Sequence, residues 1–132
     1  MKQVFYVSQA LGRHAAIPSI LSSARRRNLA LNVTGSLLFT GGYFAQVLEG
    51  EEPALAEVMA LIAADARHRD IRILLDRALD MRLFSAWSMA YTELPGMEDL
   101  LQQLGGAQAV APERADKLIR LMFDRCSGGA VS

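Results

Sequence analysis

Two strand-like runs on either side of the dipeptide Gly41-Gly42 constrain the fold of this chain more than any other feature. The runs cover Val33–Thr40 and Tyr43–Glu49, and each has the length and apolar content typical of a strand. A glycine pair readily takes the positive φ angles that a two-residue hairpin turn requires. The sequence therefore predicts a β-hairpin here, with the two strands side by side.

The segments around the hairpin alternate between the two periodicities of regular structure. Gln3–Ser8 alternates two faces, as a strand does, whereas Ile17–Asn28 has apolar residues at helical spacing. The remaining predicted elements are a helix from Pro53 to about Ala64, strands Ile71–Leu75 and Ala86–Tyr91, a helix Gly96–Leu104 stopped by Gly105-Gly106, and a helix from Pro112 to about Arg125. The order β-α-β-β-α-β-β predicts an α+β fold, a ferredoxin-like sandwich with two short C-terminal helices.

Composition and charge restrict the class of protein. The chain has 132 residues, 52% hydrophobic and 21% charged, which fits one globular domain and excludes a disordered chain. Its 14 basic and 14 acidic residues balance, which argues against nucleic acid or an anionic membrane as a partner. The single cysteine and two histidines argue against an internal disulfide and a metal site. Without an apolar run of signal-peptide or membrane-span length, we expect a cytoplasmic protein.

Three polar side chains, Tyr6, Asn28 and Gln46, stand on faces that are otherwise apolar. Asn28 continues the apolar stripe of the first helix, and Gln46 and Tyr6 each share a strand face with apolar neighbours. A buried amide without partners costs about 1 to 3 kcal/mol, so each group needs a hydrogen bond. Either the three form a polar site inside the core, or each is satisfied separately, Asn28 by capping its helix or bonding the following loop.

Other patterns have ordinary explanations when they are taken alone. Trp87, Met89 and Tyr91 share a face of the last predicted strand and by default fill the core. His68 follows the second predicted helix and by default is a solvated helix end. The last helix carries an apolar stripe with Leu121 and Phe123 outside it, so it covers the free face of the sheet or a partner surface.

Motifs of catalysis are absent from the sequence. It has no glycine-rich phosphate loop, nucleophile elbow or HExxH pattern, and Cys126 has no histidine beside it. We therefore expect that the chain is not an enzyme. A small hydrolase of this fold would need a nucleophile or an anion-binding loop that the sequence does not provide.

Six short segments, taken together, resemble BLUF domains, which are blue-light sensors that bind flavin. In family order and spacing they are Tyr6-Val7-Ser8, Asn28, Val33-Thr34-Gly35, Phe44-Ala45-Gln46-Val47-Leu48-Glu49-Gly50, Asp65-Ala66-Arg67-His68 and Phe84-Ser85-Ala86-Trp87-Ser88-Met89. Two positions depart from the usual pattern, Ala24 in place of a common serine and Ala66 in place of a common proline. The resemblance covers the chain from about Val4 to Tyr91.

The resemblance implies a flavin, usually FAD with FMN or riboflavin as alternatives, held between the first two helices. It implies that Tyr6 is the photochemical electron donor, Gln46 the switching amide, and Asn28 a ligand of the flavin carbonyl edge. Further positions that line the ring or its approach are Ile20, Arg27, Asp65, Arg67 and His68. Trp87 and Met89 match the pair that relays the change, and either could face Gln46.

The resemblance also implies how the chain is divided. Residues 1–93 would form the photosensor domain, and residues 94–132 a helical extension that packs on the domain or on a partner. The light signal would then pass to a second copy of the chain or to a separate effector protein. The alternative function is a light-insensitive, ferredoxin-like regulatory or protein-interaction module, which would have no reason to bury Tyr6, Asn28 and Gln46 together.

Overall fold

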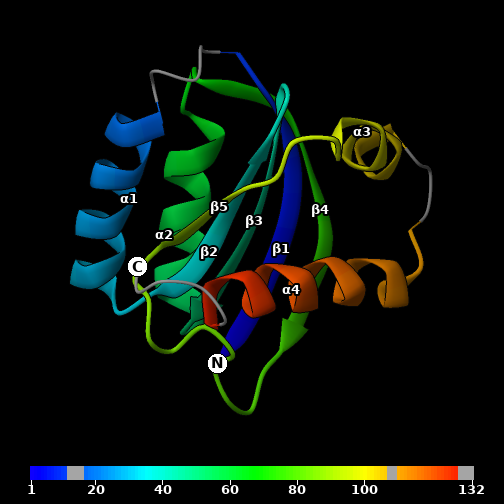
Figure 1. Cartoon of the computed structure of the whole chain (residues 1–132). Coiled ribbons are helices and arrows are strands. Elements are labelled where there is room, and N and C mark those ends of the chain that lie inside the picture. Colours follow the sequence, from blue (N-terminus) through cyan, green and yellow to red (C-terminus); the bar gives the residue numbers. More distant parts are fainter. Residues whose placement is uncertain (12–16, 107–109, 128–132) are drawn as a thin grey trace.

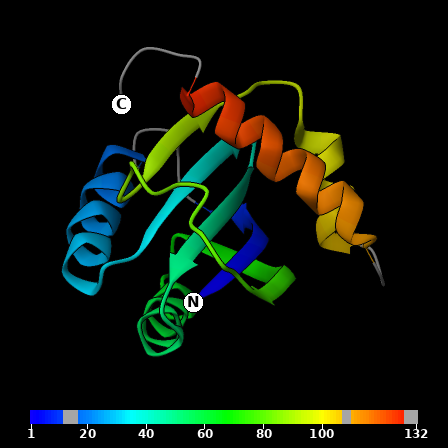
Figure 2. The same ribbon diagram turned by 90° about the horizontal axis from the view of Figure 1, so that it is seen from below.

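A five-stranded sheet lies between two layers of helices in the computed structural model of this chain, which describes residues 1–11, 17–106 and 110–127 (Figure 1, Figure 2). The strands are β1 (Lys2–Ala10), β2 (Thr34–Thr40), β3 (Tyr43–Gly50), β4 (His68–Ala78) and β5 (Ala90–Glu93). The helices are α1 (Ile17–Leu31), α2 (Glu52–Ala63), α3 (Glu98–Gly106) and α4 (Pro112–Ser127). Helices α1 and α2 cover one face of the sheet, and α3 and α4 lie on the other (Figure 2).

The strand order across the sheet is β4-β1-β3-β2-β5. Strand β1 pairs antiparallel with β3 and β4, β2 pairs antiparallel with β3, and β5 is added at the edge, parallel to β2. This arrangement confirms the predicted α+β, ferredoxin-like sandwich with one added strand.

The predicted hairpin is present, with β2 and β3 joined by Gly41-Gly42 and Thr40 opposite Tyr43. Of the two glycines, Gly41 alone has a positive φ angle, +60°. A positive φ at the first central position alone is the requirement of a type II′ turn, which suits the twist of a hairpin.

Most element ends lie within two residues of the prediction, and three boundaries differ in an instructive way. Strand β4 is longer than the predicted Ile71–Leu75 because it pairs with β1 along nearly its whole length. Helix α1 continues past Asn28 to Leu31 and ends where Asn32 takes a left-handed φ of +55°, an ending that asparagine permits without glycine. Helix α3 contains Gly105-Gly106, the pair expected to stop it.

The last strand is the largest correction. The sequence predicts it over 86–91, but β5 begins only at Ala90, and the residues before it form turns and bends. The amide of Trp87 donates to the carbonyl of Phe84 at 3.1 Å, which closes a turn, while the Trp87 carbonyl accepts from Gly35 N at 3.1 Å. The apolar alternation of this segment resembles a strand, yet its hydrogen bonds come from a turn and from the start of β2.

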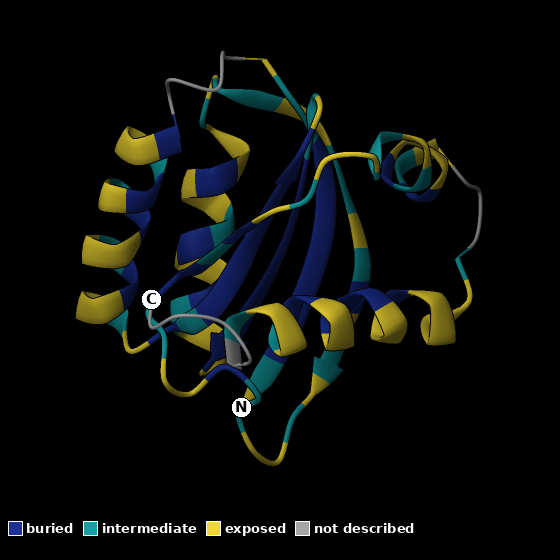
Figure 3. Ribbon diagram, viewed as in Figure 1, coloured by how far each residue is buried: buried dark blue, intermediate teal, exposed yellow. Residues whose placement is uncertain are grey.

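Side chains of the central strands alternate between two cores, as their period-two pattern predicts. Val4 and Tyr6 of β1 face the core under α1 and α2, and Phe5 and Val7 face the core under α3 and α4. Figure 3 shows the central strands buried along most of their length. In the part of the chain that the structure describes, no helix combines the length and apolar character needed to cross a membrane.

Candidate functional site

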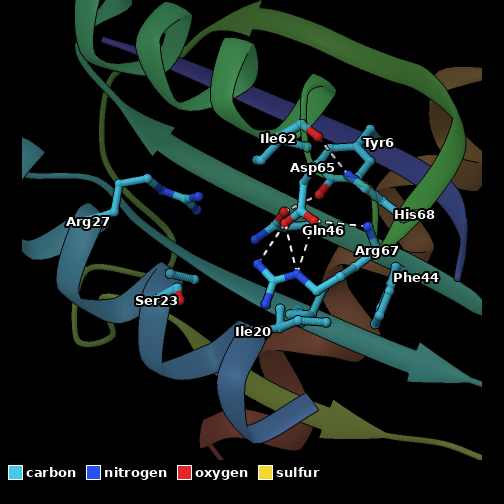
Figure 4. A pocket seen from close by; sticks show the side chains of 12 residues that line it. Tyr6, Ile20, Ser23, Arg27, Phe44, Gln46, Ile62, Asp65, Arg67 and His68 are labelled. Carbon is cyan, nitrogen blue, oxygen red and sulfur yellow. Dashed lines mark hydrogen bonds and ion pairs between the residues drawn. The ribbon is translucent and has the colours of Figure 1, made fainter. Parts of the chain in front are cut away.

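A pocket opens between α1, α2 and the sheet, on the face that carries Tyr6 and Gln46 (Figure 4). Seven residues singled out from the sequence line it: Tyr6, Ile20, Arg27, Gln46, Asp65, Arg67 and His68. They come from β1, α1, β3, the loop after α2 and the start of β4, and only the tertiary fold brings them together. Asn28 and Met89 lie next to this group without lining the pocket, and Trp87 lies across the sheet.

Tyr6 and Gln46 form the centre of the site. They sit directly opposite each other on β1 and β3 and are 3% and 4% exposed. The Tyr6 hydroxyl donates a hydrogen bond to Gln46 Oε1, and Gln46 Nε2 points at the sulfur of Met89, 3.4 Å away. A thioether is a weak acceptor, so the amide has one strong partner and one weak one. Turning this amide would therefore give up a single strong hydrogen bond, the one from Tyr6.

Burial controls the ionisation of the Tyr6 phenol. The removal of Tyr6 from water raises its pKa well above the ordinary value, Arg27 opposes this effect, and Asp65 adds to it. The phenol therefore keeps its proton throughout the physiological range and remains a donor toward Gln46.

An ion pair between Asp65 and Arg67 stands at the mouth of the pocket. Arg67 Nε lies 2.9 Å from Asp65 Oδ1, and its terminal NH2 group lies 2.7 Å from Oδ2, a two-point geometry that holds the guanidinium plane (Figure 4). The hydrogen bond from Arg67 lowers the pKa of Asp65, and the same contact raises the pKa of Arg67. Both side chains are half-buried, so this charged pair borders the pocket and is still reached by solvent.

His68 is an ordered part of the site, and its default interpretation as a solvated helix end is wrong. It is the first residue of β4, half-buried, with Nε2 2.8 Å from the carbonyl oxygen of Ile62 and Nδ1 2.9 Å from Ser8 Oγ. Because a carbonyl only accepts, Nε2 carries a proton toward Ile62, and Ser8 Oγ is the partner of Nδ1. The ring also meets Phe44 edge-on, with centroids 6.4 Å apart, so its orientation is determined by three neighbours.

Asn28 is fully buried, and neither of its ordinary interpretations is correct. Its Nδ2 donates to the carbonyl of Ser88 at 2.9 Å, so it neither caps α1 nor bonds the loop that follows the helix. Arg25 Nε donates to the carbonyl of Met89 at 3.0 Å. Two side chains of α1 thus hold the two residues before β5, a contact that no local pattern reveals.

Arg27 connects Asn28 to the pocket. Its Nε donates to Asn28 Oδ1 at 3.2 Å, and its side chain lines the pocket beside Tyr6. Partial burial lowers the pKa of Arg27, whereas Tyr6 and Asp65 act in the opposite direction, and the guanidinium remains charged. The polar side of the pocket therefore presents a fixed positive charge.

Met89 and Trp87 occupy opposite faces of the sheet, which corrects their predicted place on one face of the last strand. Met89 is 2% exposed and belongs to the core around Tyr6, with its sulfur at Gln46. The Trp87 ring lies 6.4 Å from the ring of Phe84 and 6.3 Å from that of Phe123 on α4. Of the two, Met89 is the residue that faces Gln46.

One residue to which the sequence assigns no role of its own is as deeply buried as any in the site. Glu49 has no exposed surface, and its carboxylate accepts from Gln3 Nε2 and from the main-chain amides of Leu83 and Phe84 at 2.8 to 3.0 Å. It shares a strand face with Val47. An acidic residue on an otherwise apolar strand face is the sequence pattern that could have indicated its burial. That face points away from the pocket.

The lining suits a flat aromatic ligand with a polar edge. Ile20, Leu37 and Ile62 offer apolar contact, while Gln46 and Arg27 offer donors on one side. Free space in the pocket amounts to about 40 Å³, so a three-ring ligand enters only as lining side chains move aside. Within the described ranges, no three histidine, cysteine, aspartate or glutamate side chains are grouped so that they could hold a metal ion.

Comparisons with known proteins place the chain in a family. The chain matches the BLUF family model, described as sensors of blue-light using FAD, over residues 1–90. It is similar to the dark-state structure of BlrB, a BLUF protein, with 31% identity, a TM-score of 0.77 and coverage of 92% of this chain and 94% of that one.

Two curated relatives are longer proteins. The chain is 33% identical over 108 residues to photoactivated adenylate cyclase subunit beta of Euglena longa, a match that covers 75% of this chain and 13% of the relative. It is 38% identical over 78 residues to the blue light- and temperature-regulated antirepressor BluF of Escherichia coli K12, or 59% of this chain and 19% of the relative. The chain thus spans less than a fifth of either relative. By the family match, it belongs to the BLUF family.

Proposed function

We propose that this BLUF chain is a blue-light photoreceptor that binds flavin non-covalently in the pocket between α1 and α2. FAD is the proposed cofactor, with FMN or riboflavin as alternatives. When bound, the flavin supplies blue-light absorption and, once excited, an acceptor for an electron and a proton. The observation that carries this proposal is the buried Tyr6–Gln46 hydrogen bond at the wall of the pocket, whose amide faces only a thioether on its other side.

The cofactor would be held by apolar contact on its faces and by donors at its edge. Ile20 of α1 and Ile62 of α2 would supply the apolar contact. Asn28 lies beside the pocket lining and uses one amide proton on Ser88, while Arg27 holds the amide oxygen. The second amide proton of Asn28 would serve the ligand edge once the lining side chains move aside. Asp65, Arg67 and His68 stand where the ligand would enter.

Tyr6 would act as the electron and proton donor. Its phenol is protonated because burial raises its pKa, so an electron and the Oη proton can leave together or in turn and later return to the same oxygen. Tyr6 would therefore end each cycle in the state in which it began. The lasting change must be stored elsewhere in the hydrogen-bond network.

Gln46 would store that change by rotation or tautomerisation of its amide. In the present orientation Oε1 accepts from Tyr6 and Nε2 faces the Met89 sulfur. Rotation exchanges the two ends and brings Nε2 to the Tyr6 side of the amide, which borders the pocket. A hydrogen bond from Nε2 to the cofactor there would give a small red shift of the absorption band. One net hydrogen bond is worth about 1 kcal/mol, enough to change a two-state population roughly fivefold.

The signal would leave through the segment that carries Met89 and Trp87. Met89 touches Gln46, and Trp87, two residues earlier, packs against Phe123 of α4. We assign sensing to residues 1–93 and output to residues 94–132, with light-dependent contact to a second copy of the chain or to a separate effector. On this proposal the chain is a sensor and not a catalyst, and neither nucleic acid nor a membrane is its partner.

The test is the absorption spectrum of the purified chain before and after blue light. We expect bound flavin and a small, reversible red shift, and the released cofactor can be identified by chromatography and mass. A chain without flavin, or with flavin and no reversible shift, would favour the light-insensitive regulatory module instead. Mass and amide exchange of α3 and α4, compared in dark and light, test the output.

A further inference from the structure

The buried carboxylate of Glu49 lies on the sheet face opposite the pocket and collects hydrogen bonds from two separate parts of the chain. Leu83 N and Phe84 N donate to it at 3.0 and 2.8 Å, and Gln3 Nε2 of β1 donates at 3.0 Å. Burial of a carboxylate is costly unless its oxygens are matched by donors. Here the donors are successive amides of the 82–84 turn, which β4 and β5 leave without ladder partners.

The same turn is anchored a second time by its arginine. Arg82 donates to Thr34 Oγ1 at 2.9 Å and to the carbonyls of Glu49 and Asn32 at 3.0 and 2.7 Å. The turn is therefore held against β2, β3 and the end of α1, and Glu49 provides both a side-chain and a main-chain acceptor for it.

Residues 84–89, the relay segment, connect the 82–84 turn to β5. Phe84 has no exposed surface, its carbonyl accepts from Trp87 N at 3.1 Å, and its ring packs against Trp87 and Phe123. Met89, at Gln46, is two residues beyond Trp87. A displacement of the turn would move Trp87 against α4 and Met89 against Gln46.

A chain of polar contacts joins the same carboxylate to α4. Gln3 is 2% exposed, and its Oε1 accepts from Arg77 Nε at 3.0 Å. The Arg77 guanidinium in turn lies 2.6 Å from Asp116 in the second turn of α4. Glu49 is thus connected to α4 by two routes, one aromatic through Phe84 and one polar through Gln3 and Arg77.

We propose that Glu49 is a positioning residue of the photoreceptor. Its carboxylate fixes the 82–84 turn, and through that turn it sets the places of Met89 at Gln46 and of Trp87 at α4. The polar route through Gln3 and Arg77 makes the docking of α4 depend on the same group. The light-dependent part of this assignment rests on the proposed function, whereas the positioning part concerns the dark protein and does not.

The first test replaces the carboxylate by an amide of the same shape, Glu49→Gln, with Glu113→Gln on the exposed side of α4 as the matched control. In the dark, the exchange of the Leu83 and Phe84 amides should speed up roughly tenfold in Glu49→Gln, because a charge-assisted acceptor is lost. Trp87 is the only tryptophan of the chain, so its emission should change as well. The control should leave both signals unchanged.

Under blue light, Glu49→Gln should recover to the dark state several-fold faster or slower than the natural chain. Unchanged amide exchange and emission would overturn the positioning role. Changed dark signals with unchanged recovery would overturn the role in the light response. If the natural chain shows no light response at all, the proposed function fails, while the dark signals still decide the positioning role.

A second variant tests the polar route and does not depend on the folding of Glu49→Gln. Arg77→Met removes the contacts to Gln3 and Asp116 and leaves the bonds from Glu49 to the 82–84 turn in place. We expect faster amide exchange in α4 with unchanged protection of Leu83 and Phe84. Unaltered exchange in α4 would overturn the connection to that helix.

Discussion

The two faces of the sheet differ in how completely their buried polar side chains are hydrogen-bonded. On the face of α1 and α2, Gln46 has a strong bond to Tyr6 and only a thioether at its other end. On the face of α3 and α4, the Glu49 carboxylate has three donors within 3.0 Å. Both residues belong to β3, three positions apart. Incomplete pairing beside a pocket indicates a ligand site, whereas complete pairing without a pocket indicates a structural anchor.

This difference also separates the groups that can move from those that hold the structure. An amide with one strong and one weak partner gives up a single strong hydrogen bond when it turns, whereas a buried carboxylate that loses its three donors pays a larger penalty. The relay segment, residues 84–89, connects these two groups. It is anchored to the Glu49 carboxylate on one face of the sheet and contacts the Gln46 amide on the other. Substitutions on each face test whether the two faces really differ in this way.

The largest effect should come from the incompletely paired face. Tyr6→Phe removes the proposed donor and Gln46→Leu removes the amide, so each should keep bound flavin and lose the light-shifted state completely. Difference absorption spectra before and after blue light measure this. The matched control is Tyr43→Phe, a half-buried tyrosine of β3 that does not line the pocket. A normal red shift in either test variant would refute the assigned roles.

Gly35→Ala should cause a large loss of stability, because it disturbs two strands whose side chains pack into both cores. A Cβ atom at Gly35 would stand 2.0 Å from the carbonyl oxygen of Val47, so β2 and β3 must separate. We expect a loss of about 3 kcal/mol in the free energy of unfolding, measured by urea denaturation.

The control for this substitution is Gly42→Ala, where a Cβ meets nothing within 4 Å and φ is not positive. It should change stability by less than about 1 kcal/mol. Equal stabilities of the Gly35 and Gly42 variants would show that β2 and β3 can move apart at Gly35 without loss of stability.

The face of the sheet under α3 and α4 can be tested by a pair of leucines on α4. Leu118 is 3% exposed and packs on the sheet, while Leu121 is 36% exposed. Leu118→Ala should lower the free energy of unfolding by roughly 2 to 3 kcal/mol, and Leu121→Ala by less than about 1 kcal/mol. Urea denaturation of both variants provides the measurement. Similar costs would mean that α4 is not packed on the sheet as a core element.

The smallest effect concerns the ion pair at the mouth of the pocket. Arg67 lowers the pKa of Asp65 below its ordinary 3.8, so the pair stabilises the fold above that pH. The stabilisation should vanish as the pH falls through the lowered value. Because both side chains are partly exposed, we expect only about 0.5 kcal/mol.

Urea denaturation at pH 7 and at pH 2 to 3 compares the natural chain with Asp65→Asn, which should lose this part of the pH dependence. Asp80→Asn, an exposed carboxylate with no ion pair in the described ranges, is the control and should follow the natural chain. If Asp65→Asn also follows the natural chain, the pair does not contribute to stability.

Much of the candidate site was predictable because the alternation of side chains between the two faces of a strand is a local property. A period of two places Tyr6 and Gln46 each on a face with its apolar neighbours, and the glycine turn sets the register of β2 and β3. The helical stripe likewise directs Asn28 inward, and the structure buries it completely. These inferences need only the chain direction and the geometry of one element.

The main errors about the site lie in contacts between distant segments. The alternation of Trp87 and Met89 resembles a strand, but the turn at Phe84 and the bond to Gly35 place the two side chains on opposite faces. The partner of Asn28 is a carbonyl 60 residues away. No local pattern contains the position of that carbonyl.

The sequence by itself therefore determined the element types, the hairpin and the faces of Tyr6, Asn28 and Gln46, since periodicity and turn chemistry act over a few residues. Only the tertiary structure decided that Met89, and not Trp87, meets Gln46, and that Glu49 is buried among donors. Those outcomes depend on which unpaired main-chain groups come together when the segment between β4 and β5 packs across the sheet. A buried polar group must take the partners that packing provides.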